Sequence, residues 1–501
     1  NKLKESLEKE RGAYQPHAVT GTKIFLLLRT LTNLSPMYAF SLGEYTKVFI
    51  ANLKNARSGI SPKELTAELD QSLFKGVYIR FSYALQKKDI LTFALHLLTQ
   101  HPSAYQSGEM DFLLDRIDVP ESKVSLPSWA NSESVSTFSR FCAQFPNVAK
   151  GLKFEKEEWR QWFSSPDCEK TFPAGIILRP MQRVLLVKVF REDRLPQALE
   201  DMVCQAIGLT SLNETVFSIQ SIYATEQSKD TPILFVTSVG SDPSKEIEDF
   251  AFATVGKEKF TQISMGGGQN EITIKALEQC AADGTWLCLK NLHLVPNFLS
   301  ELEKTLNLLE LKDGFKLLLT TEETPKFPRV LLESCFKVNY EAPPGLKMNV
   351  ERLYSTISSQ QLKQLSPEEA RLTYMLAVFH AILQERKTYI PQGWSKHYEF
   401  SLSDFKSGSM VLETVMTDHK IVDWPGLYGL FENAIYGGRI DRLVDLDVLR
   451  AYLETTFNEK NLKSGHMRVG PIAPTSNDIK DHHKAIAQLP EENRPSYFGL
   501  P

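Results

Sequence analysis

Residues 233–245, Ile233-Leu-Phe-Val-Thr-Ser-Val-Gly-Ser-Asp-Pro-Ser-Lys245, decide the fold of this chain. An apolar run leads into a loop of turn-forming residues, and an amphipathic pattern follows, which predicts a strand, a loop and a helix. Further short apolar runs occur at 260–264, 286–289 and 315–320, with a fifth candidate at 336–340, and helical patterns separate them. This alternation predicts a parallel α/β core of the nucleotide-binding type.

The loop after the first strand departs from a working phosphate loop, which reads G-x-x-x-x-G-K-[ST] so that N–H groups, a lysine and a hydroxyl hold phosphate and Mg²⁺. If Lys245 is the phosphate lysine, Glu246 stands at the hydroxyl position. If Gly240 is the first glycine, Lys245 and Glu246 stand at the G and K positions. We expect Asp242 at the helix N-cap and Pro243 at the first helical position, which fills the anion site with a carboxylate and removes an N–H donor. The loop is therefore predicted to be degenerate and to bind no cofactor.

The strand at 286–289 runs into Lys290-Asn291, where an active ATPase carries paired acidic residues. Lysine cannot ligate Mg²⁺, which takes oxygen ligands, so this acidic site is also degenerate and we predict no catalytic residue and no metal site. Gly266-Gly-Gly-Gln269 indicates either a tight strand-to-helix turn or a residual anion contact. The alternative function is an active P-loop nucleotidase with an atypical loop, for which Lys245 and Thr320 are the residues that could be nominated.

Composition sets the remaining limits. The chain has 501 residues, enough for several domains, and 57 basic against 61 acidic residues give a net charge of −4. This balance predicts neither a nucleic-acid partner nor a membrane surface. The six cysteines are far apart, which favours buried thiols over disulfides or zinc. The longest apolar stretch, 372–383, is too short for a bilayer span.

Helical patterns flank the predicted core on both sides. Residues 4–13 form a charged helical pattern that we expect to end near Pro16, and a buried helix is predicted from Ile24. Two packed helices are predicted over 65–98, and two more over 180–209 lead into the core. Capping boxes at Ser61-Pro-Lys-Glu64 and Ser366-Pro-Glu-Glu369 mark two helix starts.

An internal repeat links the two ends of the chain. Tyr38-x-Phe40-Ser-Leu-x-Glu44-Tyr45 matches Tyr398-x-Phe400-Ser-Leu-x-Asp404-Phe405, and Asp89-Ile-Leu-x-x-x-Leu95 matches Asp447-Val-Leu-x-x-x-Leu453. These pairs predict a repeating unit of about 360 residues. Its helical tail occurs at both ends of the chain and its α/β core once.

Four segments follow from these patterns. Residues 1–115 are expected to be the helical small subdomain of a preceding module, and 116–350 the large α/β subdomain with a helical lead-in. Residues 351–463 are expected to be a helical small (lid) subdomain. Recurring prolines in 464–501 predict a linker and the start of a further, C-terminal domain.

Several stretches carry a family resemblance that covers nearly the whole chain. The chain resembles the C-terminal motor region of dynein heavy chains, from the end of the fifth AAA+ module through the sixth to the start of the C-terminal domain. It is most similar there to the cytoplasmic dynein of intraflagellar transport. Two departures are Arg191-Glu-Asp193, where the family usually has Arg-Pro-Asp, and Gly267, which replaces a common Gln. The matching stretches are Met37-Tyr-Ala-Phe-Ser-Leu42, Gly266-Gly-Gly-Gln269, Gly284-Thr-Trp-Leu-Cys-Leu-Lys-Asn-Leu-His-Leu294, Pro343-Pro-Gly-Leu-Lys347, Gln384-Glu-Arg386, Tyr436-Gly-Gly-Arg439 and Phe498-Gly-Leu-Pro501.

The resemblance implies a fold of class α/β plus α: a degenerate AAA+ module with a five-stranded parallel core and a helical small subdomain, preceded by the helical subdomain of another module. It implies a non-hydrolytic module that closes the ring of a minus-end-directed microtubule motor for retrograde intraflagellar transport. Its partners would be the rest of the heavy chain, and, through the full complex, accessory chains, intraflagellar transport particles and, by the stalk, the microtubule. ATP and Mg would bind other modules, and the protein would occur in cytoplasm, cytoskeleton and cilium.

A module that transmits change without hydrolysing nucleotide should be most sensitive at packed joints between rigid bodies. We nominate Pro343-Pro344-Gly345, between core and lid, and Gly437-Gly438-Arg439. The two glycines are expected to allow a turn that a Cβ would obstruct, and Arg439 to tie a helix end to a neighbour.

Overall fold

The computed structural model describes residues 2–54, 62–101, 104–116, 124–212, 218–237, 242–342, 345–389, 391–418, 422–490 and 494–500. The chain forms two compact units, Asn1–Glu214 and Thr215–Pro501. Within the described residues, no helix combines the length and the apolar character that a membrane crossing requires.

The second unit opens with the predicted sheet, and all five expected strands are present. They lie parallel in the order β2-β3-β4-β1-β5, so the first strand of the sequence lies between the last two. Every residue of β1 is buried, as its unbroken apolar run predicted. The strands are β1 (Ile233–Thr237), β2 (Phe260–Ser264), β3 (Trp286–Lys290), β4 (Lys316–Glu322) and β5 (Phe336–Tyr340).

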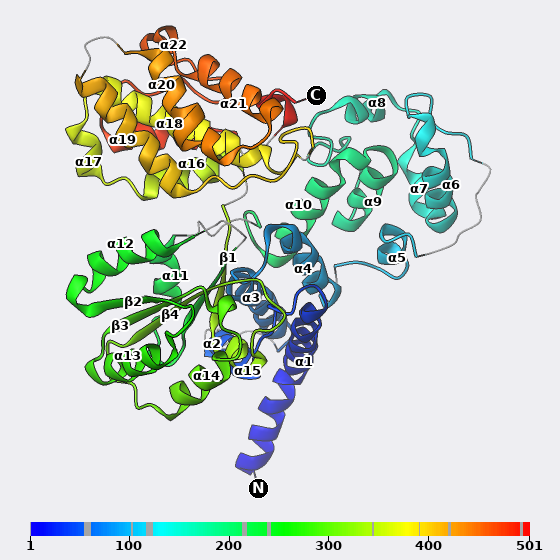
Figure 1. The fold of residues 1–501 in the computed structure, drawn as a ribbon. Helices are drawn as coiled ribbons and strands as arrows, with labels where there is room; N and C mark the ends of the chain where they lie inside the picture. The colour runs from blue at the N-terminus through cyan, green and yellow to red at the C-terminus, as the bar shows by residue number, and fades with distance from the viewer. Residues whose placement is uncertain are drawn as a thin grey trace. The chain divides into compact units, whose positions relative to one another are not determined.

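Helices cover both faces of this sheet (Figure 1). Helices α11 and α12 lie on one face, and α13, α14 and α15 on the other. Connections between parallel strands are right-handed, so the direction in which the chain crosses the sheet decides which face the connecting helix covers. The chain crosses in one direction from β1 to β2 and in the opposite direction from β2 to β4, so the connecting helices lie on opposite faces. The carboxyl ends of β1, β3 and β4 consequently share one edge of the sheet. These helices are α11 (Ile219–Thr225), α12 (Ser244–Thr254), α13 (Asn270–Asp283), α14 (Leu299–Leu308) and α15 (Arg329–Ser334).

The rest of the second unit is a helical lid built around α18. The predicted capping box starts this helix: Ser366 N–H donates to Glu369 at 2.6 Å and Glu369 N–H to Ser366 Oγ at 3.2 Å. Helix α18 is buried along nearly its whole length and packs on α16 and α19. The lid elements are α16 (Leu346–Ser355), α17 (Ser359–Gln364), α18 (Pro367–Arg386), α19 (Leu402–Asp418), α20 (Trp424–Leu430), the π-helical η6 (Phe431–Ile435), the 3-10 turn η7 (Gly437–Arg439), α21 (Leu443–Thr456), α22 (Glu459–Ser464), α23 (Ile479–Ala487) and the 3-10 turn η8 (Pro495–Phe498).

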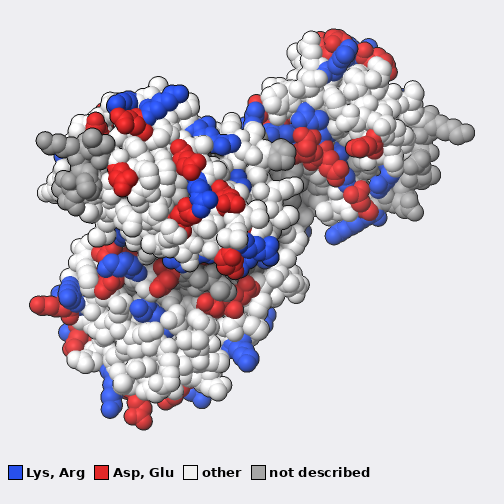
Figure 2. Space-filling view, turned by 45° about the horizontal axis from the view of Figure 1, so that its top comes forward, with Lys and Arg blue, Asp and Glu red and all other residues white. Residues whose placement is uncertain are grey.

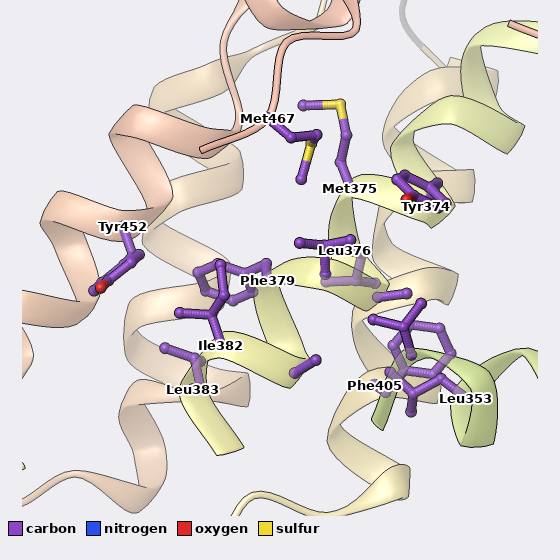
Figure 3. Packing of buried hydrophobic residues seen from close by; sticks show 14 of the residues in the cluster. Leu353, Tyr374, Met375, Leu376, Phe379, Ile382, Leu383, Phe405, Tyr452 and Met467 are labelled. Atoms are coloured by element: carbon purple, nitrogen blue, oxygen red, sulfur yellow. The ribbon is translucent and has the colours of Figure 1, made fainter. Parts of the chain in front are cut away.

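The described part of 464–501 packs into the lid core, where the prolines predicted a linker that leads away. Met467, Ile486 and Phe498 belong to the same buried cluster as α18. Figure 3 shows Met467 beside Met375 of α18. The prolines interrupt regular structure here, but apolar residues between them hold the segment on the lid. The module boundaries at 115, 350 and 463 stay predictions.

The first unit is helical, and two of its features differ from expectation. Helix α1 continues through Pro16, where we expected a break, and His17 one residue later is buried and bonded to Asp70 of α3. This tertiary contact holds the helix past the proline, although the ring removes one backbone hydrogen bond.

The two helices predicted over 180–209 are present as α9 and α10, but they pack in this unit: Tyr78 of α3 donates to Leu212 O at 2.7 Å. The capping serine Ser61 lies outside the described residues. The helices are α1 (Lys2–Thr30), α2 (Leu42–Lys54), α3 (Pro62–Ser82), α4 (Lys87–Thr99), α5 (Glu109–Leu113), α6 (Val135–Gln144), α7 (Pro146–Leu152), α8 (Glu157–Ser164), α9 (Pro180–Phe190) and α10 (Leu195–Ile207).

Charges of both signs are intermixed on the surface. On the face that Figure 2 shows, Lys and Arg lie close to Asp and Glu over the described residues. Such a surface produces no extended field of one sign. All six cysteines are unpaired, Cys142 is half-buried and the others are buried.

Candidate functional site

The edge of the sheet beside the start of α12 is where a phosphate loop would act. Gly240 lies outside the described residues. Helix α12 begins at Ser244, one residue later than expected, with Pro243 at the N-cap. Asp242 Oδ1 nevertheless accepts the Ser244 N–H at 2.9 Å, so a carboxylate of the chain uses a donor at the helix start. A phosphate at this position would meet that negative charge.

Lys245 does not point into this site. Its ammonium lies 3.2 Å from both Glu248 and Asp249 on its own helix, and its side chain is 60 % exposed. These carboxylates raise its pKa through hydrogen bonds, those of Asp249 first. The lysine is therefore engaged with α12 itself, where a phosphate lysine would reach into the loop.

At the end of β3, the groups of Asn291 are engaged with neighbouring strands. Asn291 has a left-handed backbone (φ 59°), which lets its N–H reach Thr320 Oγ1 at 3.1 Å. Its side chain donates to Ser264 at 3.3 Å. Thr320 is buried in β4 and is used by this bond. Within the described ranges, no group of three or more His, Cys, Asp or Glu side chains could hold a metal ion.

A small cavity between this edge and the lid measures about 30 Å³ and is lined by Asp242, Tyr340, Arg352, His380, Gln384 and Phe400, among others. A second cavity, between α12 and the lid, measures about 190 Å³. The first has room for about one or two water molecules, and both are smaller than ligand pockets, which measure roughly 300–1,000 Å³. His380 lies 3.0 Å from the Tyr436 hydroxyl, and burial lowers its pKa to about 3. It is a neutral, hydrogen-bonded histidine of the lid core.

The junction between core and lid is held by the end of α18. Pro343 and Pro344 lie outside the described residues. Gly345 has φ +92°, and its N–H donates to Glu385 Oε1 at 2.9 Å. Asn349 Nδ2 donates to the same oxygen at 2.8 Å, so the first turn of α16 is tied to a buried carboxylate.

The neighbours of Glu385 hold two further segments, and we call Gln384, Glu385 and Arg386 the α18 triad. Gln384 donates to the carbonyl of Phe400, ahead of α19. Arg386 donates to Phe498 O at 2.6 Å and to Gly393 O at 2.7 Å. Three consecutive side chains therefore tie the junction, the α19 entry and the end of the chain to one helix.

Sequence reasoning did not assign these roles to the triad. The signal that could have indicated them is its position: charged residues directly after the apolar run 372–383, on a helix too buried to solvate them. Buried charges of this kind require partners, and the partners are the segments that the resemblance had marked separately.

Tyr436-Gly-Gly-Arg439 follows the π-helical segment η6, and its two glycines differ. A Cβ on Gly437 would lie 1.5 Å from the carbonyl oxygen of Glu432, which no packing adjustment can accommodate. A Cβ on Gly438 would lie 3.6 Å from Asn433 O, an ordinary contact. The expectation that a Cβ is obstructed therefore holds at Gly437 and not at Gly438. Arg439 lies 2.9 Å from Asp404 in the first turn of α19, the tie to a helix end that we expected.

The repeat in the sequence corresponds to repeated contacts. Tyr38 donates to Asp89 at 2.7 Å in the first unit, and Tyr398 donates to Asp445 at 2.7 Å in the second. The sequence alignment had paired Asp89 with Asp447. The structure uses Asp445, which like Asp89 is the third residue of its helix.

A second contact repeats as well. Glu44 accepts from Arg80 at 3.3 Å, and Asp404 accepts from Arg439 at 3.0 Å. Both carboxylates lie in the first turn of the helix that follows the repeated motif. The two helical segments thus share their internal ties, which supports a duplicated helical subdomain.

Replacing Tyr398 by phenylalanine should lower the stability of the second unit by about 1.5–3 kcal/mol, the usual contribution of a hydrogen bond to a charged group. Burial raises the pKa of Asp445, but hydrogen bonds from Ser395 and Tyr398 outweigh it and hold that pKa below its ordinary value. The stability from this carboxylate is present above the ordinary pKa and is lost as pH falls through the lower folded value. Urea unfolding at several pH values should therefore show that the difference in stability between Tyr398→Phe and the unchanged chain shrinks in acid. A difference that grows in acid would contradict this assignment.

Comparisons with known proteins agree with these observations. Residues 228–339 match the family model "Dynein heavy chain region D6 P-loop domain", and residues 369–501 match "Dynein heavy chain AAA lid domain". The chain is 37% identical over 515 residues to cytoplasmic dynein 2 heavy chain 1 of Tripneustes gratilla and 37% identical over 525 residues to that of Homo sapiens. It is 29% identical over 524 residues to dynein axonemal heavy chain 10 of Homo sapiens. These alignments include 99–100% of this chain and 12% of each relative, so the chain spans about an eighth of their length.

Proposed function

Because this chain belongs to the dynein heavy chain family, we propose that it is a non-hydrolytic AAA+ module, which closes the ring of a microtubule motor and passes conformational change between its neighbours. One observation carries the proposal: the two cavities between core and lid measure about 30 Å³ and about 190 Å³. Both are smaller than ligand pockets, which measure roughly 300–1,000 Å³. The module would thus act through its joints.

The charges around these cavities support the same proposal. The Asp242 carboxylate takes the Ser244 N–H at the start of α12, and Lys290 ends the strand where an acidic residue would be needed. Nothing observed at Lys245 or Thr320 favours the alternative of an atypical P-loop nucleotidase. The first pairs on its own helix and the second accepts from Asn291.

The finer assignment follows the relatives. Identity to the cytoplasmic dynein 2 heavy chains of Tripneustes gratilla and Homo sapiens, 37%, exceeds the 29% identity to the axonemal chain, which favours a minus-end-directed motor for retrograde intraflagellar transport. We propose as partners the remaining modules and linker of a heavy chain, accessory chains, intraflagellar transport particles and, through a stalk, the microtubule. ATP and Mg would bind other modules, and the protein would act in the cytoplasm, on the cytoskeleton and in the cilium.

Calorimetric titration of the 501-residue chain with ATP·Mg should show no binding tighter than roughly 1 mM, about 4 kcal/mol. The physical reason is steric and electrostatic, because both cavities between core and lid are smaller than a ligand pocket and Asp242 repels phosphate. ADP without Mg²⁺ should give the same result. A saturable heat at micromolar ligand would overturn the non-hydrolytic assignment and favour the P-loop nucleotidase.

A further inference from the structure

Helix α12 presents a carboxylate to the lid from the place where a phosphate-binding helix would present its hydroxyl. Glu246 Oε2 lies 3.5 Å from Arg352 Nη2 and accepts the Tyr340 hydroxyl at 2.8 Å. The side chains of Glu246 and Arg352 are 16 % and 13 % exposed. The pair is thus largely removed from water, where charge pairing is less screened.

Arg352 connects the two parts of this unit. It belongs to α16, the first helix of the lid, while its partners belong to the α/β core. Its guanidinium lies 4.8 Å from the centre of the Tyr340 ring and donates to Glu341 O at 3.2 Å. The planar group therefore contacts the end of β5 as well as Glu246, a set of interactions that a lysine could not reproduce.

A second ion pair lies one turn along α12. Lys406 of α19 lies 2.9 Å from Asp249 of α12. Glu246 and Asp249 are three residues apart, so they lie on one side of the helix. Helix α12 thus holds cations from two lid helices, α16 and α19.

We propose that Glu246 supplies to the lid arginine the negative charge that a nucleotide phosphate would supply, so that the lid is held on the core without nucleotide. Carboxylate and phosphate present similar oxygen geometry to a guanidinium. The inference rests on the proposed function and adds to it the residues that fix the joint. Because both partners are parts of the chain, the joint persists through the nucleotide cycle of any neighbour.

Hydrogen exchange of the 501-residue chain without nucleotide tests this assignment. Glu246→Gln keeps the size and the contact with Tyr340 but leaves the Arg352 guanidinium unpaired. Amide hydrogens of α16 should exchange about ten-fold faster, because the free energy lost with this ion pair should lie between that of an exposed pair and that of a fully buried pair. The matched control is Glu333→Gln, whose partner Arg329 lies on the same helix α15, and it should leave α16 unchanged.

In the double variant Glu246→Gln/Arg352→Gln, neither charge of the pair remains. Its amides in α16 should therefore exchange more slowly than expected from adding the effects of Glu246→Gln alone and Arg352→Gln alone. Arg352→Lys, a milder change, should give a smaller increase and keeps the test usable if the neutral variants do not fold. Equal exchange in Glu246→Gln, Glu333→Gln and the unchanged chain, or strictly additive single effects, would overturn the inference. Protection of α16 in the unchanged chain by added ATP·Mg would instead overturn the proposed function.

Discussion

Replacing Arg386 by alanine should destabilise the second unit by about 3–5 kcal/mol, from lost hydrogen bonds to a charged group and from the cavity left by a large buried side chain. The guanidinium donates to Phe498 O, Gly393 O and the Tyr452 hydroxyl, at 2.6, 2.7 and 3.0 Å. It also lies 5.3 and 5.1 Å from the ring centres of Trp394 and Tyr452. Alanine would remove both Arg386 donors from the Gly393 carbonyl, leave Phe498 O with the Tyr452 hydroxyl alone, and open a cavity between two aromatic rings.

The measurement is urea unfolding followed by hydrogen exchange in α18, which separates this unit from the first. Arg450→Ala is the matched control, because Arg450 pairs with Glu432 at 47 % exposure and its loss should cost about 1 kcal/mol or less. Arg386→Lys keeps the charge but loses the planar guanidinium with its several N–H donors, so we expect a loss of stability between those of the two alanine variants. Equal costs for Arg386→Ala and Arg450→Ala would show that the triad does not hold the end of the chain.

Gly437→Ala should disrupt the turn after η6 and, in a heavy chain that carries this sequence, weaken microtubule-stimulated ATPase and movement. The added Cβ would lie 1.5 Å from Glu432 O, so the backbone must unwind, at about 3 kcal/mol or more. Gly438→Ala is the matched control, since its Cβ would meet its nearest neighbour at 3.6 Å. A motor that tolerates Gly437→Ala as well as Gly438→Ala would contradict the role of this turn.

Arg439→Ala tests the same joint without a steric clash. It removes the pair with Asp404, whose Oδ2 also accepts hydrogen bonds from Ser401 ahead of α19. We expect a reduction in stimulated ATPase of about five-fold or more, the low end of ordinary coupling energies. Lys245→Ala should leave ATPase and movement nearly unchanged, because its contacts stay on α12. A motor inactivated by Lys245→Ala and normal with Arg439→Ala would mean that the core performs nucleotide chemistry.

The sequence by itself determined the sheet and its degenerate edge. Buried strands such as 233–237 are unbroken apolar runs, and the residue types at Asp242, Glu246 and Lys290 predict a degenerate edge wherever their side chains point. Such features can be predicted from the sequence because hydrophobic periodicity, turn residues and ligand preference depend on residues that are close together in the sequence. The capping box at Ser366 and the repeat of the tyrosine motif belong to the same class.

Only the tertiary structure decided which residues hold the parts together. Arg352 and Glu246 are 106 positions apart, and Arg386 and Phe498 are 112 apart, so no local pattern pairs them. The same applies to helix α1, which continues past Pro16 on contacts with α3, and to residues 464–500, whose prolines suggested a linker. In each case the deciding energy comes from burying charge or apolar surface against distant segments, and that energy exists only once the chain has folded.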